Sequence, residues 1–341
     1  MQMMADGARR LRSRLKRLGL TDAAIRAAWP RWWSDEAEQS ASAQAELRFG
    51  VARRLGLDPR SLFDDERQPP RFRWRDEARF KHLSGEEPEE LAGIVSFAQS
   101  VATVTAAALR GEPRQLGSAR DLREQILASG RPYVELLDIV TLAWAVGIPT
   151  LQLRVFPWPQ KRMAAMSVAT DGTFAVMIGK ESNFPATIAF YVAHELAHIS
   201  LGHVGAGHQL VDLEDDGGPV SSDRDAEDQA ADAFALELLT GDPQPTVLAE
   251  DPKHVSASEL ARTATNSAER LRIDPGTLAL CFGYTTGNWG VANAALSRIY
   301  NGGRPVWNAI NAIAREQLAL DDLPLDAADF LRSVLGEQTA A

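Results

Sequence analysis

The chain has 341 residues, 45% of them hydrophobic and 24% charged, and its formal net charge is −10 at pH 7. This composition is typical of a globular protein with a buried core, and the negative charge excludes a protein that binds nucleic acid over its whole surface, because phosphate contacts need clustered cations. No apolar run reaches the roughly 18–20 residues that cross a bilayer, the basic N-terminus lacks the apolar stretch of a signal peptide, and Cys281 is the one cysteine. We therefore expect a cytoplasmic protein with no membrane contact and no internal disulfide.

Residues 1–66 are predicted to form a domain of short helices. Leucine or valine recurs at helical spacing in residues 10–18 and 42–55, and a glycine follows each stretch, as is typical of a helix C-terminus. Another helix is expected between them, and Pro30 interrupts it.

Basic and aromatic residues decide whether this first domain could contact DNA. Its first twenty residues contain six cations: Arg9, Arg10, Arg12, Arg14, Lys16 and Arg17. Residues 45–62 resemble the last helix of a repressor-type helix-turn-helix domain, but Trp29, Trp32 and Trp33 occupy the place of the polar recognition helix. Indoles suit packing or protein contact better than the reading of base edges. The domain is therefore helix-turn-helix-like; DNA contact stays open, and sequence-specific reading is disfavoured.

Two other segments flank a central part of different composition. Residues 67–130 begin with a charged stretch around Pro69-Pro70, typical of a linker, and continue as an Ala-rich helical pattern. Residues 242–341 have short helical patterns separated by Gly- and Pro-containing turns. We expect four units, with the boundaries 1–66, 67–130, 131–241 and 242–341.

The central unit, residues 131–241, combines strand and helix patterns. Its expected elements in order are helix 134–146, strands 150–156 and 164–178 with a turn at 171–172, helix 184–203 and helix 222–239. The predicted fold class is α+β, mostly helical, with a small antiparallel or mixed sheet packed on the helix 184–203 and with flanking helical domains.

The helix 184–203 carries the pattern H-E-x-x-H at His194, Glu195 and His198. Residues four apart lie on one face of a helix, so both imidazoles can reach one ion at about 2.0–2.1 Å. The adjacent carboxylate can take a proton from water on a zinc ion (Zn²⁺), which lowers the pKa of that water to about 7. The alternative is a pair of hydrogen-bonded core histidines, but two buried imidazoles and a carboxylate on an apolar helix are costly unless they are ligated or paired.

A zinc site of this kind needs a third protein ligand. A metzincin-type histidine would stand six residues after the motif, whereas His203 stands five residues on and is expected to cap the helix or support a ligand. His208 follows two glycines and is a weaker candidate. Asp228 and Asp232 lie four residues apart on the second helix, so one can ligate while the other orients a histidine. Glu227 lies about 100° around that helix from Asp228 and is the alternative ligand.

These motifs together resemble the ImmA/IrrE family of zinc metallo-endopeptidases. The resemblance covers roughly residues 132–241 and rests on the segments 144–149, 190–203 and 228–239. It implies a gluzincin-like minimal peptidase core. The family's third ligand is usually a glutamate in the pattern E-x-x-A-[ND]-x-F-A, and this position is Asp228 here. The side chain is one methylene shorter, which leaves Glu227 as an alternative and leaves weakened zinc binding open.

The resemblance also implies a function. Such peptidases often cut a helix-turn-helix repressor in response to DNA damage or to signals from mobile elements, and many carry a helix-turn-helix domain of their own. We therefore expect a zinc endopeptidase of a stress response, with Glu195 as general base. The alternative is a regulator that binds DNA or a partner, of the toxin–antitoxin or mobile-element type, with a vestigial metal site. Tyr191, His208 and Tyr284 are the candidate oxyanion stabilisers.

Overall fold

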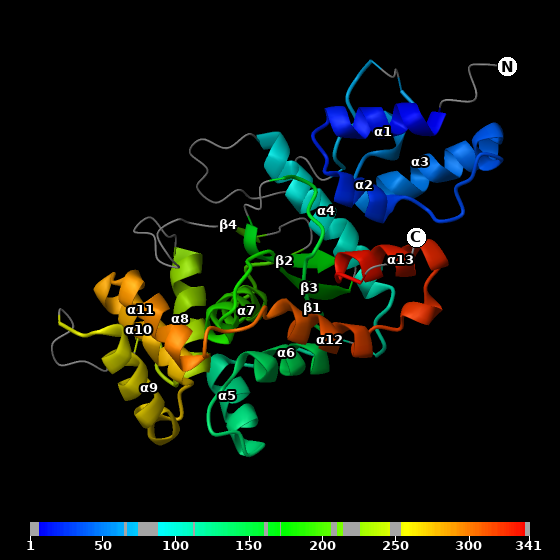
Figure 1. Cartoon of the computed structure of the whole chain (residues 1–341). Helices are drawn as coiled ribbons and strands as arrows, with labels where there is room; N and C mark the ends of the chain where they lie inside the picture. Colours follow the sequence, from blue (N-terminus) through cyan, green and yellow to red (C-terminus); the bar gives the residue numbers. More distant parts are fainter. Residues whose placement is uncertain are drawn as a thin grey trace.

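The computed structural model contains thirteen α-helices in its described part and one small mixed sheet (Figure 1), so the predicted class, α+β and mostly helical, is confirmed. The described residues are 7–64, 67–73, 88–111, 113–159, 163–170, 172–205, 210–213, 226–245 and 254–337. Within them, no helix combines the length and the apolar character that crossing a membrane requires.

The sheet has four strands in the order β1–β3–β2–β4. They are β1 (Thr150–Gln152), β2 (Met163–Thr170), β3 (Thr173–Ile178) and β4 (Leu210–Leu213). β1 runs parallel to β3, and the other two pairs are antiparallel. The expected β2–β3 hairpin closes with Gly172 at a φ of +89°, which glycine adopts without steric strain. β4 is a fourth strand, whereas the sequence predicts two or three.

Two helices of the central unit pack on each other and on this sheet. α7 (Pro185–Ser200) begins with a proline in its first turn, where the missing N–H has no helical partner to lose, and it packs against β2 and β3. α8 (Ala226–Thr240) packs along α7, and its Ala231 and Ala235 are fully buried. Small side chains at these positions let two helix backbones approach closely, which brings the polar side chains of α7 and α8 together.

The N-terminal helices are α1 (Gly7–Arg17), α2 (Asp22–Ala28) and α3 (Ala41–Leu55). The hydroxyls of Thr21 and Ser40 cap α2 and α3 by accepting backbone N–H groups, and Gly56 ends α3 in the left-handed region. Residues 29–40, which include the three tryptophans, hold only a 3₁₀ turn (Ala37–Gln39), so no recognition helix stands between α2 and α3.

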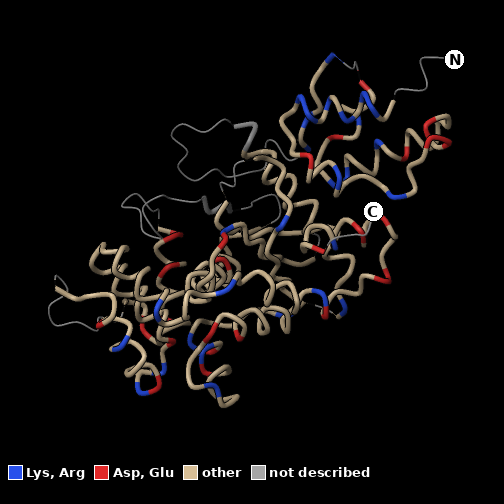
Figure 2. Tube along the Cα trace, viewed as in Figure 1, with Lys and Arg blue, Asp and Glu red and all other residues tan. Residues whose placement is uncertain are grey.

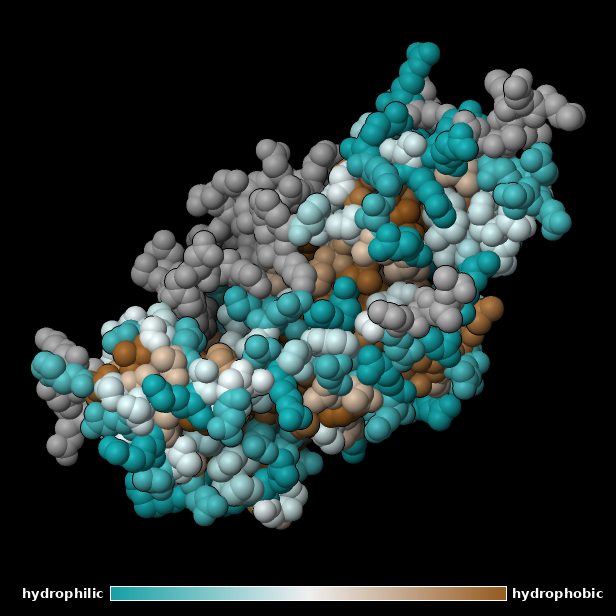
Figure 3. Space-filling model, in the orientation of Figure 1, coloured by the Kyte–Doolittle hydropathy of each residue, from teal (hydrophilic) through white to brown (hydrophobic). Residues whose placement is uncertain are grey.

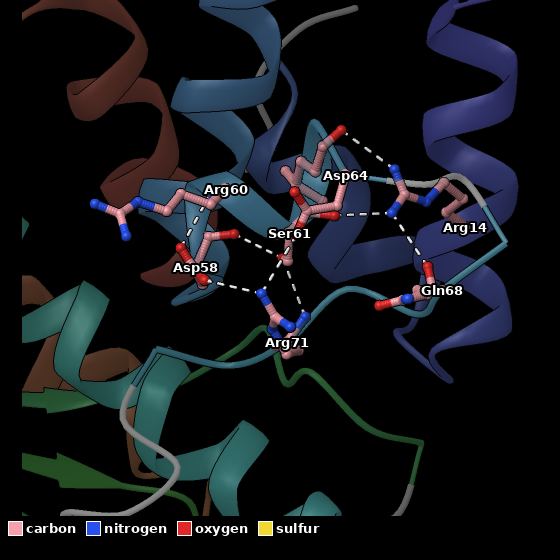
Figure 4. A network of polar contacts seen from close by, with 8 residues as sticks. Arg14, Asp58, Arg60, Ser61, Asp64, Gln68 and Arg71 are labelled. Atoms are coloured by element: carbon pink, nitrogen blue, oxygen red, sulfur yellow. Dashed lines mark hydrogen bonds and ion pairs between the residues drawn. The ribbon is translucent and has the colours of Figure 1, made fainter.

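Residues 67–73, part of the segment predicted as a linker, are folded against these helices. Leu57 and Phe72 form an antiparallel bridge. The buried guanidinium of Arg14 on α1 donates to the carbonyl oxygens of Ser61, Leu62 and Gln68, which ties the first helix to this segment (Figure 4). The end of the segment therefore belongs with the N-terminal helices.

The N-terminal helices also pack on the rest of the chain. The Phe72 ring lies 5.7 Å from that of Trp158, in the loop after β1, in an edge-to-face arrangement. Gly93 on α4 (Pro88–Ala106) leaves room for this indole, since a Cβ there would lie 2.4 Å from the Trp158 ring. One continuous hydrophobic core runs from α1 to the last helix.

The remaining helices surround the sheet and its two central helices (Figure 1). They are α5 (Ala119–Ala128), α6 (Leu136–Ala145), α9 (Ala257–Leu271), α10 (Pro275–Thr286), α11 (Trp289–Ile299), α12 (Trp307–Gln317) and α13 (Leu325–Val334). α9, α10 and α11 have small hydrophobic clusters of their own, and α10 contacts α7. α1–α3 and α9–α11 thus lie at opposite ends of the molecule, with the sheet and α7 between them.

Candidate metal centre

His194 and His198 face the same point from successive turns of α7. Their Nε2 atoms lie 3.0 Å apart, and each residue is only 1% exposed. The helix places them there because residues i and i+4 share a face. The distance between the Nε2 atoms is close to the roughly 3.3 Å that two nitrogens have on one tetrahedral zinc ion with bonds of about 2.0–2.1 Å.

Asp228 on α8 supplies the third group. Its Oδ1 lies 3.5 Å from Nε2 of His198, and one ligand atom from each of His194, His198 and Asp228 falls within 4.8 Å of the others. Glu227, the alternative ligand, is half-buried and is not part of this group of three. Ala231 and Ala235 are fully buried where α8 packs along α7, which fits the shorter side chain of an aspartate ligand.

The outward nitrogen of each histidine has a partner of its own. Asp232 Oδ1 lies 2.9 Å from Nδ1 of His194, and Nδ1 of His203 lies 2.9 Å from Nδ1 of His198. A carboxylate at Nδ1 holds the proton on that nitrogen and leaves the Nε2 lone pair directed at the shared point. Asp232 therefore takes the orienting position predicted for it, and His203 supports His198 at the end of the helix.

Glu195 points toward the sheet and is 1% exposed. The hydroxyl of Ser167 on β2 lies 2.5 Å from Glu195 Oε2 and 2.9 Å from the Glu195 carbonyl oxygen. This hydroxyl supplies the hydrogen bond that a buried carboxylate needs. Ser167 was not predicted from the sequence, although a serine within the otherwise apolar run 163–169 is a recognisable signal.

The candidate oxyanion stabilisers Tyr191 and Tyr284 lie on different helices. The hydroxyl of Tyr284 on α10 donates to Asp232 Oδ2 at 3.4 Å, behind the histidine, and Tyr191 is half-buried on α7. His208 lies outside the described residues. Tyr284 thus supports the residue that orients His194.

The residues present fit a metal ion. Two imidazoles and one carboxylate, almost fully buried, form the nitrogen and oxygen set that zinc binds in catalytic sites. Three converging acceptor atoms would repel one another without a cation or protons between them, so the buried His194–His198–Asp228 group can hold a metal ion.

The chain has no match among protein-family models, curated proteins or solved structures. The site is therefore characterised by its own geometry: a buried group of two histidines and one aspartate that can hold a metal ion, with the carboxylate of Glu195 on the adjacent residue.

Proposed function

We propose that the protein is a zinc-dependent endopeptidase that hydrolyses a peptide bond in a regulatory protein, and that this substrate is a helix-turn-helix repressor. The observation that carries the proposal is the convergence of His194, His198 and Asp228 on one point, with a buried carboxylate on the residue after His194, Glu195. Zinc is the metal of choice for this set of ligands, and the H-E-x-x-H pattern is that of zinc peptidases.

The chain's own residues have distinct roles in this proposal. Bound zinc would supply Lewis acidity and bring the pKa of its water to about 7. Glu195 accepts the proton from the attacking water at its carboxylate and passes it to the amine of the leaving product. Ser167 holds Oε2 of that carboxylate in place. Asp232 holds His194 in the tautomer that ligates through Nε2.

The substrate class and the location are inferred from features of the sequence. The resemblance of residues 132–241 to the ImmA/IrrE family favours a repressor as substrate and a role in a stress response. A cytoplasmic location fits the single, buried cysteine, Cys281, because proteins of oxidising compartments commonly carry disulfides.

The decisive comparison is between the wild type and Glu195→Gln, with Glu237→Gln on α8, at a glutamate ion-paired with Arg120, as the matched control. Each is expressed in cells, its zinc content is measured, and new protein N-termini are identified by mass spectrometry. We expect all three to hold about one zinc, and only Glu195→Gln to lose the cleavage products. Identical termini in all three would refute a peptidase and favour the alternative, a DNA- or partner-binding regulator whose metal is structural.

A further inference from the structure

Two phenylalanines of the N-terminal unit, Phe49 on α3 and Phe63 directly after the 3₁₀ helix Pro59–Leu62, are exposed and lie against each other. Phe49 on α3 is 51% exposed and Phe63 is 47% exposed, which makes them the most exposed aromatic side chains of the described residues. Their ring centroids are 5.0 Å apart. Single exposed apolar residues are ordinary, but a contacting pair of half-exposed rings leaves a joint apolar surface in water that a partner could cover.

Arginines surround this pair. The guanidinium of Arg48 lies 5.7 Å from the Phe63 ring centroid. Arg53 is exposed four residues after Phe49 on α3, and Arg60 is exposed three residues before Phe63, so each shares a face with one ring. The Arg60 guanidinium points away from Asp58 and Arg71 (Figure 4). We call these five residues, Arg48, Phe49, Arg53, Arg60 and Phe63, the aromatic–cationic patch.

The charge of the surrounding unit favours an anionic partner. Residues 7–73 contain 15 Lys and Arg against 9 Asp and Glu, a net charge of +6, whereas the rest of the chain carries −16. Many of these cations lie along α1 and around α3 (Figure 2), and the face in Figure 3 is hydrophilic over most of this unit. A polyanion is therefore attracted to this end of the molecule and repelled from the other.

The geometry of the patch fits exposed bases better than a duplex. A base inserted between the rings would need about 6.8 Å, twice the 3.4 Å stacking distance, but the ring centroids are 5.0 Å apart and the ring planes are tilted by 44°. The tilted pair therefore offers only its outward faces as a platform for bases. Bases in a duplex hide their faces, and a major groove needs a recognition helix, which residues 29–40 do not form. Stacking on aromatic rings together with cations for the phosphates is how proteins bind single strands.

We propose that the aromatic–cationic patch binds single-stranded DNA. Guanidinium groups contact the phosphates, and the Phe49–Phe63 platform stacks against one or two bases. The five side chains of the patch include no acceptor for the proton of a ribose 2′-hydroxyl, the group that distinguishes RNA from DNA. This activity is separate from the proposed peptidase, because no member of the patch lies on α7 or α8.

The test uses the full-length protein and a fluorescently labelled 15-nucleotide oligothymidylate, with anisotropy as the readout. Phe49→Ala/Phe63→Ala is expected to weaken binding at least about tenfold. Arg53→Gln/Arg60→Gln is expected to lower the slope of log affinity against log salt by about 1.4, since each phosphate contact contributes about 0.7. Glu46→Gln removes an exposed carboxylate three residues before Phe49 on α3 and should tighten binding. Leu137→Ala, at an exposed apolar residue on α6, is the matched control and should change nothing.

Several results would overturn the proposal. These are no binding at low salt, equal binding by the Phe49→Ala/Phe63→Ala variant with an unchanged circular dichroism spectrum, or a duplex or oligouridylate bound more than tenfold more tightly. A wild-type dimer that the same double substitution dissolves would assign the patch to a second copy of the chain. Glu195→Gln and zinc-free protein should bind like the wild type, so failure of the peptidase proposal leaves this result unchanged.

Discussion

Asp232 Oδ1 lies 2.9 Å from Nδ1 of His194. Asp228 lies one turn earlier on the same helix, α8, and its Oδ1 is 3.5 Å from Nε2 of His198. One helix thus places two carboxylates on opposite sides of the same pair of histidines: one at the point where the imidazoles converge and one behind it. The i, i+4 spacing of the two aspartates on α8 thus matches the i, i+4 spacing of the two histidines on α7.

Asp232→Asn should weaken zinc binding by about 10–100-fold, because a neutral amide no longer favours the Nδ1 proton and the orientation of His194. Competition with a chromogenic chelator measures this affinity. Glu237→Gln, on the same helix and ion-paired with Arg120, is the control and should bind zinc like the wild type. An unchanged zinc affinity in Asp232→Asn would mean that Asp232 only fills space.

Asp228→Ala should lose most of its zinc after purification at neutral pH, since two imidazoles alone hold the ion less tightly than three protein ligands. Glu227→Ala should retain about one equivalent. Zinc content by mass spectrometry separates the two. The reverse pattern would assign the ligand to Glu227 and would require α8 to rotate from the position described.

Ser167→Ala should lower the free energy of unfolding by about 1–3 kcal/mol, because the buried Glu195 carboxylate loses a hydrogen-bond donor. Ser100→Ala is a matched control: Ser100 is also buried, but its hydroxyl has no hydrogen-bond partner among the residues that the structure describes. Ser100→Ala should therefore leave the free energy of unfolding unchanged or raise it slightly. Urea unfolding of both variants gives the comparison, and equal effects would argue against a bond between Ser167 and Glu195.

Much of the site could be predicted because it depends on spacing within single helices. His194, Glu195 and His198 share one helix, and Asp228 and Asp232 share another, so helical periodicity places them correctly relative to one another. The apolar positions of α7 and α8 also indicate which faces pack. These are local properties, and they can be predicted without knowledge of the rest of the fold.

The remainder depends on contacts between distant segments. Ser167 reaches Glu195 only because β2 packs on α7, and no spacing links a strand residue to a helix residue 28 positions away. Tyr284 meets Asp232 from α10 for the same reason. Residues 67–73 pack on the N-terminal helices, and Phe72 pairs with Leu57. The sequence did not predict this contact, because Pro69-Pro70 is typical of a linker.

A pH effect on stability is expected at Asp274, where α10 begins. Burial raises the pKa of this carboxyl above 3.8, although it accepts hydrogen bonds from the Thr277 N–H and the Tyr300 hydroxyl. A raised pKa in the folded state contributes stability that is complete below pH 3.8 and is lost as pH rises through the folded-state pKa. The stability of Asp274→Asn relative to the wild type should therefore increase from pH 3.5 or so to neutrality. A pH-independent difference in urea unfolding would contradict this.

The most direct test of the metal centre is anomalous X-ray diffraction, measured at the zinc absorption edge from crystals grown in the presence of zinc. We expect one strong anomalous peak within about 2.0–2.2 Å of Nε2 of His194, Nε2 of His198 and a carboxylate oxygen of Asp228. No peak at this point, with zinc present in the crystal, would contradict the metal centre on which the proposed peptidase rests.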